Sequence, residues 1–225
     1  MKRVALALLL ALVLAGCGGV REHGAATLWV TRDRGAQIVF SGRVPAGLSA
    51  MQALERKVKV STRYGGRFVQ SIDGVQGSLS GQRDWFYFVN GVEADSGATA
   101  VRLRPGDVEW WDYRSWRGGA MTVPVVLGAF PEPFLHGFEG VPAGSTAVIA
   151  NGVPRSLAAR IAAEVHGTVS PKRPRASSIV IGGVPAGTPR IHRTAHGVLL
   201  ELGAGAARRL AADPAAFRYR YGSTT

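Results

Sequence analysis

The stretch "DWFYFVNG", residues 84–91, decides the fold of the first half of this chain. It places four large apolar side chains in a row and ends on Asn90-Gly91, a pair that suits a type I′ turn because both central residues need positive φ. Residues 108–113, "VEWWDY", repeat the aromatic pattern. Soluble strands with one solvated face alternate apolar and polar side chains. Two strands with aromatic rings on both faces therefore either fill a core from two sides or leave one face exposed to bind a flat apolar ligand.

The segments around these strands predict a sheet crossed by one helix. Residues 27–44 have the alternation of two strands around a turn at Arg34-Gly35. Ser49 is expected to cap a short helix whose apolar stripe ends at Val58. Further strands are expected over residues 67–75, 84–91 and 108–116, with a tight turn at Pro105-Gly106 before the last. This order predicts an α+β fold in which one helix packs across one face of a mixed sheet.

Four blocks of the first half, taken in order, are similar to a known family. They are "SAMQALER" (49–56), "GRFVQSIDGV" (66–75), "WFYFVNGVEADSGATAVRLRPGD" (85–107) and "WWDY" (110–113). Together they resemble the transcobalamin C-terminal-like domain of bacterial exported proteins, and the resemblance covers residues 27–116. It implies a β-grasp-like mixed sheet with one helix, related to the small domain that covers the macrocycle in vertebrate cobalamin carriers. Glu109 departs from the family pattern, because an apolar residue facing the helix is expected there.

The resemblance does not by itself imply a cobalamin carrier. In the carriers, a large helical domain supplies the other half of the cobalamin site, and these 225 residues contain no counterpart of it. The resemblance therefore implies a module descended from a ligand-covering domain.

The second half of the chain, residues 117–225, carries no family resemblance. Its expected elements are an apolar strand running into a Pro-rich loop (122–134), a strand, turn and amphipathic helix (145–169), a strand (178–184), a strand, glycine turn and helix (197–214), and a closing strand (216–222). Leu157, Ile161 and Val165 form the apolar stripe of the first helix. Strands that alternate with helices predict a small α/β domain.

The first residues predict export. Residues 1–16 join a short basic start to the apolar run "VALALLLALVLA", the pattern of a secretory signal that is too short to span a bilayer. "LAGC", residues 14–17, resembles the bacterial lipobox; an ordinary signal peptide with an incidental cysteine is the alternative. We expect acylation (palmitate) at Cys17, the only cysteine, with residues 17–26 as a tether. The protein is then expected to be lipid-anchored at the extracytoplasmic face of the cell membrane.

Charge narrows the expected partners. The formal net charge is +12, and once the signal is removed the excess is +7 over residues 117–225 against +3 over residues 18–116. Nucleic acid is not expected as a partner of an exported, tethered protein. Anionic lipid headgroups or wall polymers are the expected targets of this charge. Arginines that are merely solvated are the other explanation.

Catalytic and metal-binding signatures are not found in the sequence. It has no G-x-S-x-G, H-E-x-x-H or P-loop motif. His192 and His196 have the i,i+4 spacing of a helical metal site, but Pro189 before them and "GVLLEL" after them favour strand or loop. We therefore expect that the protein binds no metal ion, has no cofactor and is not an enzyme. The competing hypothesis is an enzyme in the second half that uses His166, His192 or His196 beside Glu201.

Gly203 and Gly205 stand between an expected strand and an expected helix, which is similar to a dinucleotide-binding turn. Arg208 occupies the position of the third glycine that such a motif needs. A tight turn and a helix start are therefore the expected role of both glycines.

The aromatic strands supply the candidate ligand-binding residues. Trp85 and Tyr87 share one face of their strand, and Trp111 and Tyr113 share one face of theirs. These four side chains are the expected contacts for a planar ligand such as a cobalamin-like tetrapyrrole, because rings bury much area at low entropy cost. A protein or glycan interaction surface of the cell envelope is the alternative function, and a purely structural role in the core is the alternative for the four residues.

Overall fold

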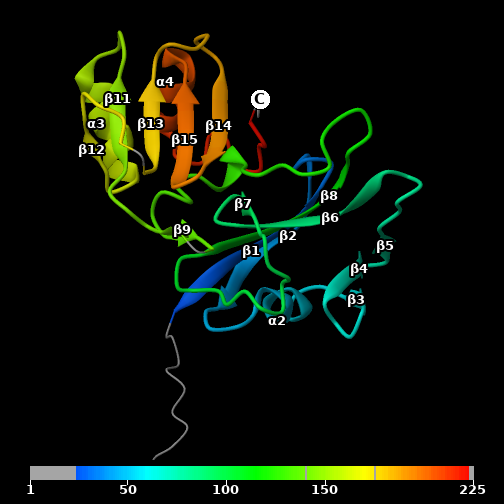
Figure 1. The fold of residues 1–225 in the computed structure, drawn as a ribbon. Helices are drawn as coiled ribbons and strands as arrows, with labels where there is room; N and C mark the ends of the chain where they lie inside the picture. The colour runs from blue at the N-terminus through cyan, green and yellow to red at the C-terminus, as the bar shows by residue number, and fades with distance from the viewer. Residues whose placement is uncertain (1–23, 140, 175, 223–225) are drawn as a thin grey trace, which may run out of the picture.

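The computed structural model describes residues 24–139, 141–174 and 176–222 (Figure 1). These residues form a mixed α and β structure with several sheets, mostly strands, and three α-helices. None of these helices is long and apolar enough to cross a membrane. The expected signal peptide and the expected lipidation site, Cys17, lie outside the described residues. The first strand begins at Ala25, inside the expected tether.

The first half forms a mixed five-stranded sheet of order β2-β1-β8-β6-β7. The central pair β1/β8 is parallel and the other neighbours are antiparallel. A separate three-stranded sheet, β3-β4-β5, and helix α2 lie on the same side of the five-stranded sheet (Figure 1). The elements are β1 (Ala25–Arg32), β2 (Gln37–Pro45), α2 (Ala50–Glu55), β3 (Val60–Arg63), β4 (Phe68–Ile72), β5 (Val75–Gln76), β6 (Arg83–Val89), β7 (Val92–Glu93) and β8 (Val108–Ser115).

Two local predictions from the sequence are confirmed. Ser49 caps α2 in a capping box: its Oγ accepts from the Gln52 backbone N–H at 3.1 Å, and Gln52 Oε1 accepts from the Ser49 N–H at 2.9 Å. Asn90 and Gly91 join β6 to β7 with φ of 54° and 77°, the signs that a type I′ turn requires. Asn90 Oδ1 also accepts a hydrogen bond from the Val108 backbone N–H at 2.8 Å, which connects the turn to β8.

The second half forms another five-stranded sheet, of order β12-β11-β13-β15-β14. All its neighbours pair in parallel except β14 and β15, which are antiparallel. Helices α3 and α4 join one side of this sheet in a single hydrophobic cluster that includes Leu157, Ile161, Ile179, Leu200 and Leu210. The elements are β11 (Ala147–Ala150), α3 (Arg155–Glu164), β12 (Thr168–Val169), β13 (Ser178–Ile181), β14 (Pro189–Thr194), β15 (Gly197–Leu202) and α4 (Ala204–Ala212).

The segment between the two large sheets was predicted as an apolar strand running into a Pro-rich loop over 122–134, and the described structure lacks this strand. The segment contains a 3-10 helix, η1 (Leu127–Ala129), and a single bridge between Val92 and Val125. A short two-stranded sheet, β9 (Gly137–Phe138) and β10 (Val141–Pro142), follows. The predicted strand is reduced to the bridge at Val125 because Pro124 lacks the N–H that a strand ladder needs, whereas Pro131 and Pro133 belong to the Pro-rich loop predicted after it.

The closing strand predicted over 216–222 is also absent from the described structure. The segment is a series of turns, with Tyr219 at φ 61°. Its alternating aromatic and basic residues mimic a strand, but Phe217 packs in the C-terminal core while Tyr219 and Tyr221 pack against the first sheet. We name residues 217–222 the C-terminal tail.

Candidate functional site

The four residues predicted to contact a ligand lie together on one face of the first sheet, on the side covered by α2. In register across β6 and β8, Tyr87 stacks on Trp111 with ring centroids 4.7 Å apart, and Trp85 meets Tyr113 at 5.3 Å. The indoles of Trp85 and Trp111 are only 6% and 3% exposed. Both tyrosine hydroxyls donate to backbone carbonyl oxygens. These rings are therefore part of the core.

The opposite face of the same sheet is covered as well. Trp29, Phe88 and Trp110 pack there against the C-terminal tail and the segment that leads to η1. Tyr221 is 7% exposed and meets Trp110 edge to face at 5.5 Å. The open aromatic platform suggested for Trp85, Tyr87, Trp111 and Tyr113 is therefore absent from the described structure. Helix α2 and the small sheet cover the face of these four residues, and the distant end of the chain covers the other face. The rings fill a core from two sides.

A buried carboxylate fixes the tail to this face. Asp112 is fully buried and accepts hydrogen bonds from the Thr31 hydroxyl at 2.6 Å, the Arg34 N–H at 3.1 Å, the Gly35 N–H at 3.2 Å and the Tyr221 hydroxyl at 2.7 Å. Four donors compensate the desolvation of the charge. Burial is the main cause that raises the pKa of Tyr221 above its ordinary value, and the neighbouring Asp112 carboxylate adds to it.

Glu109, the departure from the family pattern, is a buried carboxyl group on the helix side. It is fully inaccessible; its Oε1 accepts from Trp111 Nε1 at 2.6 Å, while Oε2 has no partner among the described residues. Burial raises the pKa of Glu109 to about 8, so the group is mainly neutral at pH 7. Because the carboxyl group of Glu109 is protonated, it can be buried at a position where an apolar residue is expected.

An edge cavity of about 220 Å³ keeps three of the predicted residues within reach of a ligand. Trp85, Tyr87 and Trp111 form part of its wall, with Phe68 of β4 and Ala98 beside them. The cavity lies at the margin of the sheet and does not open a flat face. Tyr113 is not part of its lining.

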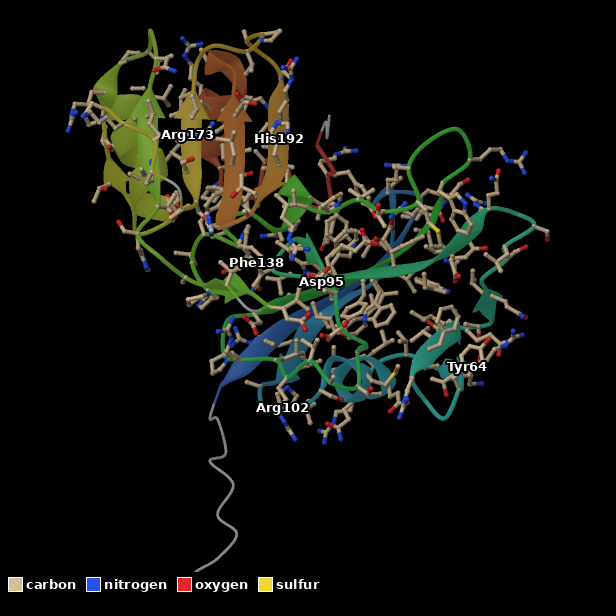
Figure 2. The ribbon with its side chains drawn as sticks, viewed as in Figure 1. Tyr64, Asp95, Arg102, Phe138, Arg173 and His192 are labelled. Carbon is tan, nitrogen blue, oxygen red and sulfur yellow. The ribbon has the colours of Figure 1, made fainter. Side chains whose placement is uncertain are left out.

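The most exposed apolar surface is a groove that adjoins this cavity and shares Phe68 with it. We name it the apolar groove; it has a volume of about 340 Å³ and is lined by Arg63, Tyr64, Phe68, Gln70, Gln76, Gly77, Leu79, Asp84 and Met121. Tyr64 and Leu79 are each 77% exposed, Met121 48% and Phe68 44%. Tyr64 lies at the end of the molecule remote from the C-terminal sheet (Figure 2).

Polar contacts shape the walls of the groove. Arg114, fully buried over the Phe86 ring, donates from Nη2 to the Met121 carbonyl at 2.7 Å, which holds the Met121 loop in place. Burial raises the pKa of Asp84 above its ordinary value. A Cβ atom on Gly77 would lie 2.1 Å from Asp84 Oδ1, so a larger residue after β5 would require the Asp84 side chain to move.

Tyr64, Leu79 and Met121 were not among the residues predicted from the sequence to bind a ligand. Each is a large apolar side chain in a segment rich in glycine or serine: "RYGG", "GSLSG" and "GGAM". Turns favour small and polar residues, so an apolar residue set among them was an available signal. That the three meet at one groove depends on pairing between distant strands and could not be read from the sequence.

Of the candidate residues of the second half, His192 and Glu201 lie within hydrogen-bond distance of each other. His192 lies in β14 with Nε2 at 3.2 Å from Glu201 Oε2, while His196 is an exposed turn residue. Their strand and turn positions confirm that the i,i+4 spacing is not helical. His166 follows α3 with φ 48°. Among the described residues, no cluster of three or more His, Cys, Asp or Glu side chains could hold a metal ion.

The glycine turn before α4 has a packing explanation. Gly203 is the N-cap of α4, and a Cβ atom there would lie 2.0 Å from the Pro185 carbonyl oxygen. The expected role in a tight turn and helix start is confirmed.

The chain was compared with protein families, curated proteins and solved structures. Residues 47–115 match a family model described as "Domain of unknown function (DUF4430)". No curated protein sequence matches the chain. Among solved structures, the chain is similar to haptocorrin in complex with Cbi (14% identity, 44% of this chain, 27% of that chain, TM-score 0.35) and to a protein of Ruminococcus gnavus described as a candidate metal-binding protein (17% identity, 41% of this chain, 98% of that chain, TM-score 0.32).

Proposed function

We propose that this protein is a lipid-anchored binding protein, held at the extracytoplasmic face of the cell membrane through Cys17. Its β-grasp-like first half, residues 27–116, captures a ligand, and the basic α/β half, residues 117–225, lies beside it. One observation carries the binding role: four of the five large hydrophobic side chains that the described residues expose line the apolar groove. Contiguous exposed apolar surface of this kind is typical of binding sites.

The groove suits one side of a flat, largely apolar ligand. Tyr64 and Phe68 meet edge to face with ring centroids 6.3 Å apart, and rigid rings give contact area at low entropy cost. A volume of about 340 Å³ is near the lower end for ligand pockets, so a large ring system would leave part of its surface outside. A cobalamin-like tetrapyrrole is the first candidate, as a bound ligand and not as a resident cofactor.

Tryptophan fluorescence of the full chain, titrated with cobalamin, tests this function. Trp85 lines the cavity that adjoins the groove, so a ligand seated against Phe68 is expected to quench its emission at micromolar concentration. Leu79→Ala should weaken binding about tenfold, because it removes apolar contact worth 1–2 kcal/mol.

Ile38→Ala is the matched control. Ile38 is the fifth exposed large hydrophobic side chain, 56% accessible, and lies in β2 outside the groove. We expect it to bind cobalamin as the unchanged chain does. Equal weakening by both variants would remove the groove as the site, and an absence of quenching in the folded protein would remove the tetrapyrrole.

A protein or glycan of the cell envelope is the alternative ligand. Arg63, Gln70 and Asp84 stand around the aromatic floor of the groove, and sugars offer both an apolar face and hydroxyl groups to such a mixture. Titration with soluble envelope glycan fragments, with and without Tyr64→Ala, separates this alternative from the first. Binding of the glycan that Tyr64→Ala abolishes, without any response to cobalamin, would replace the tetrapyrrole.

An enzyme in the second half is the less favoured alternative. Its support is the His192–Glu201 pair at 3.2 Å, because a carboxylate partner orients an imidazole and makes it a better base. Hydrolysis of model esters that His192→Gln abolishes would favour this alternative.

A further inference from the structure

The second sheet carries a polar pocket on the face that no helix covers. Along β13 and β15, Ile179 and Leu200 point into the core formed with α3 and α4, so Ser178 and Leu199 point to the other side. A cavity of about 440 Å³ opens there, lined by Arg173, Pro174, Ala176, Ser178, Thr194, Ala195, His196 and Leu199. Arg173 and His192 both lie over this sheet (Figure 2).

The lining has the chemistry of an anion site. Arg173 brings a permanent positive charge and a planar array of donors that matches phosphate oxygens. His196 adds a ring that can donate a hydrogen bond, and Ser178 and Thr194 add hydroxyl groups. None of the described lining residues is an Asp or Glu. The nearest acidic residue on this face in the strand register, Glu201, is paired with His192.

An unsatisfied hydroxyl group is a second, independent sign of a ligand. Thr194 Oγ1 is buried and has no hydrogen-bond partner among the described residues. A buried hydroxyl group without a partner costs about 1–3 kcal/mol. A rotation of the Thr194 side chain toward the adjoining cavity would let an oxygen of a bound anion accept this hydrogen and remove the cost.

We propose that this pocket binds a phosphate group. Arg173 and His196 lie against the negative charge of the phosphate, and the Thr194 and Ser178 hydroxyl groups donate hydrogen bonds to its oxygens. Two sources offer this chemistry to a protein anchored at a membrane: the headgroup of an anionic phospholipid and a free phosphate ester. The site is independent of the apolar groove, which lies at the far end of the first sheet.

Nuclear magnetic resonance of the His196 imidazole in the full chain tests the proposal. The two probes are inorganic phosphate and dihexanoyl phosphatidylglycerol below its micelle concentration. We expect either probe to shift the His196 signals in a saturable way. Saturation by the short-chain lipid at lower concentration than by phosphate identifies a headgroup site, and the reverse identifies a free phosphate ester; a lack of saturable shifts with both overturns the proposal.

Three variants distinguish specific binding in the pocket from nonspecific electrostatic attraction. Arg173→Gln should weaken the probe's affinity about tenfold or more, the effect of losing a charge-assisted hydrogen bond. Thr194→Val should weaken it several-fold while leaving the protein equally or more stable, since it deletes an unsatisfied hydroxyl group. Arg155→Gln, an exposed arginine at the start of α3, is the control and should change nothing. Equal losses with Arg155→Gln and Arg173→Gln would overturn the proposal.

Discussion

The two large sheets of this protein differ in how their faces are covered. The first sheet is closed on one side by α2 and the small sheet, and on the other by the C-terminal tail and the segment before η1. The second sheet has both its helices on one side, and a pocket with polar lining opens on the other. Strands of the first sheet hold Trp29, Trp85, Trp110 and Trp111, whereas the open face of the second sheet holds the polar pocket with the unsatisfied Thr194 hydroxyl group.

This difference teaches that ring density alone does not indicate a docking face. Trp29, Trp85, Trp110 and Trp111 are each 7% exposed or less, because a sheet covered on both faces needs large side chains on both. The exposed apolar residues instead gather at the margin, where the β3–β4 and β5–β6 turns and the Met121 loop converge. Edges and singly covered faces are where this fold leaves room for ligands.

The largest expected effect comes from uncovering the second face of the first sheet. Tyr221→Ala removes a buried ring and one of the four donors to Asp112, so the free energy of unfolding should fall by about 3–5 kcal/mol. Tyr221→Phe keeps the ring and should cost about 1–2 kcal/mol. Urea denaturation followed by tryptophan fluorescence measures both. A loss under 1 kcal/mol for Tyr221→Ala would break the account of a face closed by the tail.

The next effect depends on pH and concerns the helix side of the same sheet. The pKa of Glu109 is about 8 in the folded protein against an ordinary 4.5. Between these values the folded state holds a proton that the unfolded state has released, so stability should fall as pH rises from about 5 to 8. Glu109→Gln keeps an oxygen for Trp111 Nε1 and cannot ionise.

We therefore expect Glu109→Gln to be more stable than the unchanged chain by roughly 2–4 kcal/mol at pH 9 and nearly equal to it at pH 5. Thermal denaturation across this pH range measures the difference. Parallel pH profiles for the two proteins would show that Glu109 does not hold its proton in the fold.

A matched pair of valines compares the two sheets directly. Val30 in β1 is fully buried beneath the cover of the first sheet, and Val180 in β13 lies half-buried on the face of the second sheet that lacks helices. Val30→Ala should cost about 2 kcal/mol, the transfer of two methyl groups plus a small cavity. Val180→Ala should cost less than about 1 kcal/mol because its site already meets solvent. Equal losses would mean that the second sheet is covered as fully as the first.

The smallest effect is expected where the two halves meet through charge. Arg193 of β14 forms a two-pronged ion pair with Asp95, at 3.1 Å and 2.6 Å, and the pKa of Asp95 is lowered by this hydrogen bonding. Because Asp95 is 66% exposed, solvent screens the pair and its coupling should be below about 1 kcal/mol. A double-mutant cycle with Asp95→Asn and Arg193→Gln, at low and high salt, measures it. A larger, salt-independent coupling would contradict this interpretation.

Local sequence patterns predicted most elements of the fold. The capping box at Ser49, the turn at Asn90-Gly91 and the apolar stripe of α3 are encoded within a few neighbouring residues, and each is present in the structure. The strand predicted over residues 216–222 and the strand predicted at the start of 122–134 were wrong. The second fails in part because Pro124 lacks an N–H, and the two failures also share a cause. Both segments pack against distant parts of the chain, and their alternation or apolar content reflects that packing.

The candidate site was predictable only in part. The face shared by Trp85, Tyr87, Trp111 and Tyr113 follows from strand alternation and is correct. That Tyr221, more than a hundred residues away in the sequence, covers the other face could not be inferred from local patterns. The limits of the domains, the lipid at Cys17 and the ligand stay predictions.

Hydrogen–deuterium exchange of the full chain, with and without saturating cobalamin, tests most directly whether the ligand enters at the margin and not onto a sheet face. We predict that the ligand slows exchange in residues 63–79 and around Met121, and that β1, β8 and the C-terminal tail exchange as slowly without ligand as with it. Ligand-induced protection confined to β1 and the tail, with residues 63–79 unchanged, would contradict the account, because the second face of the aromatic sheet would then be the docking surface.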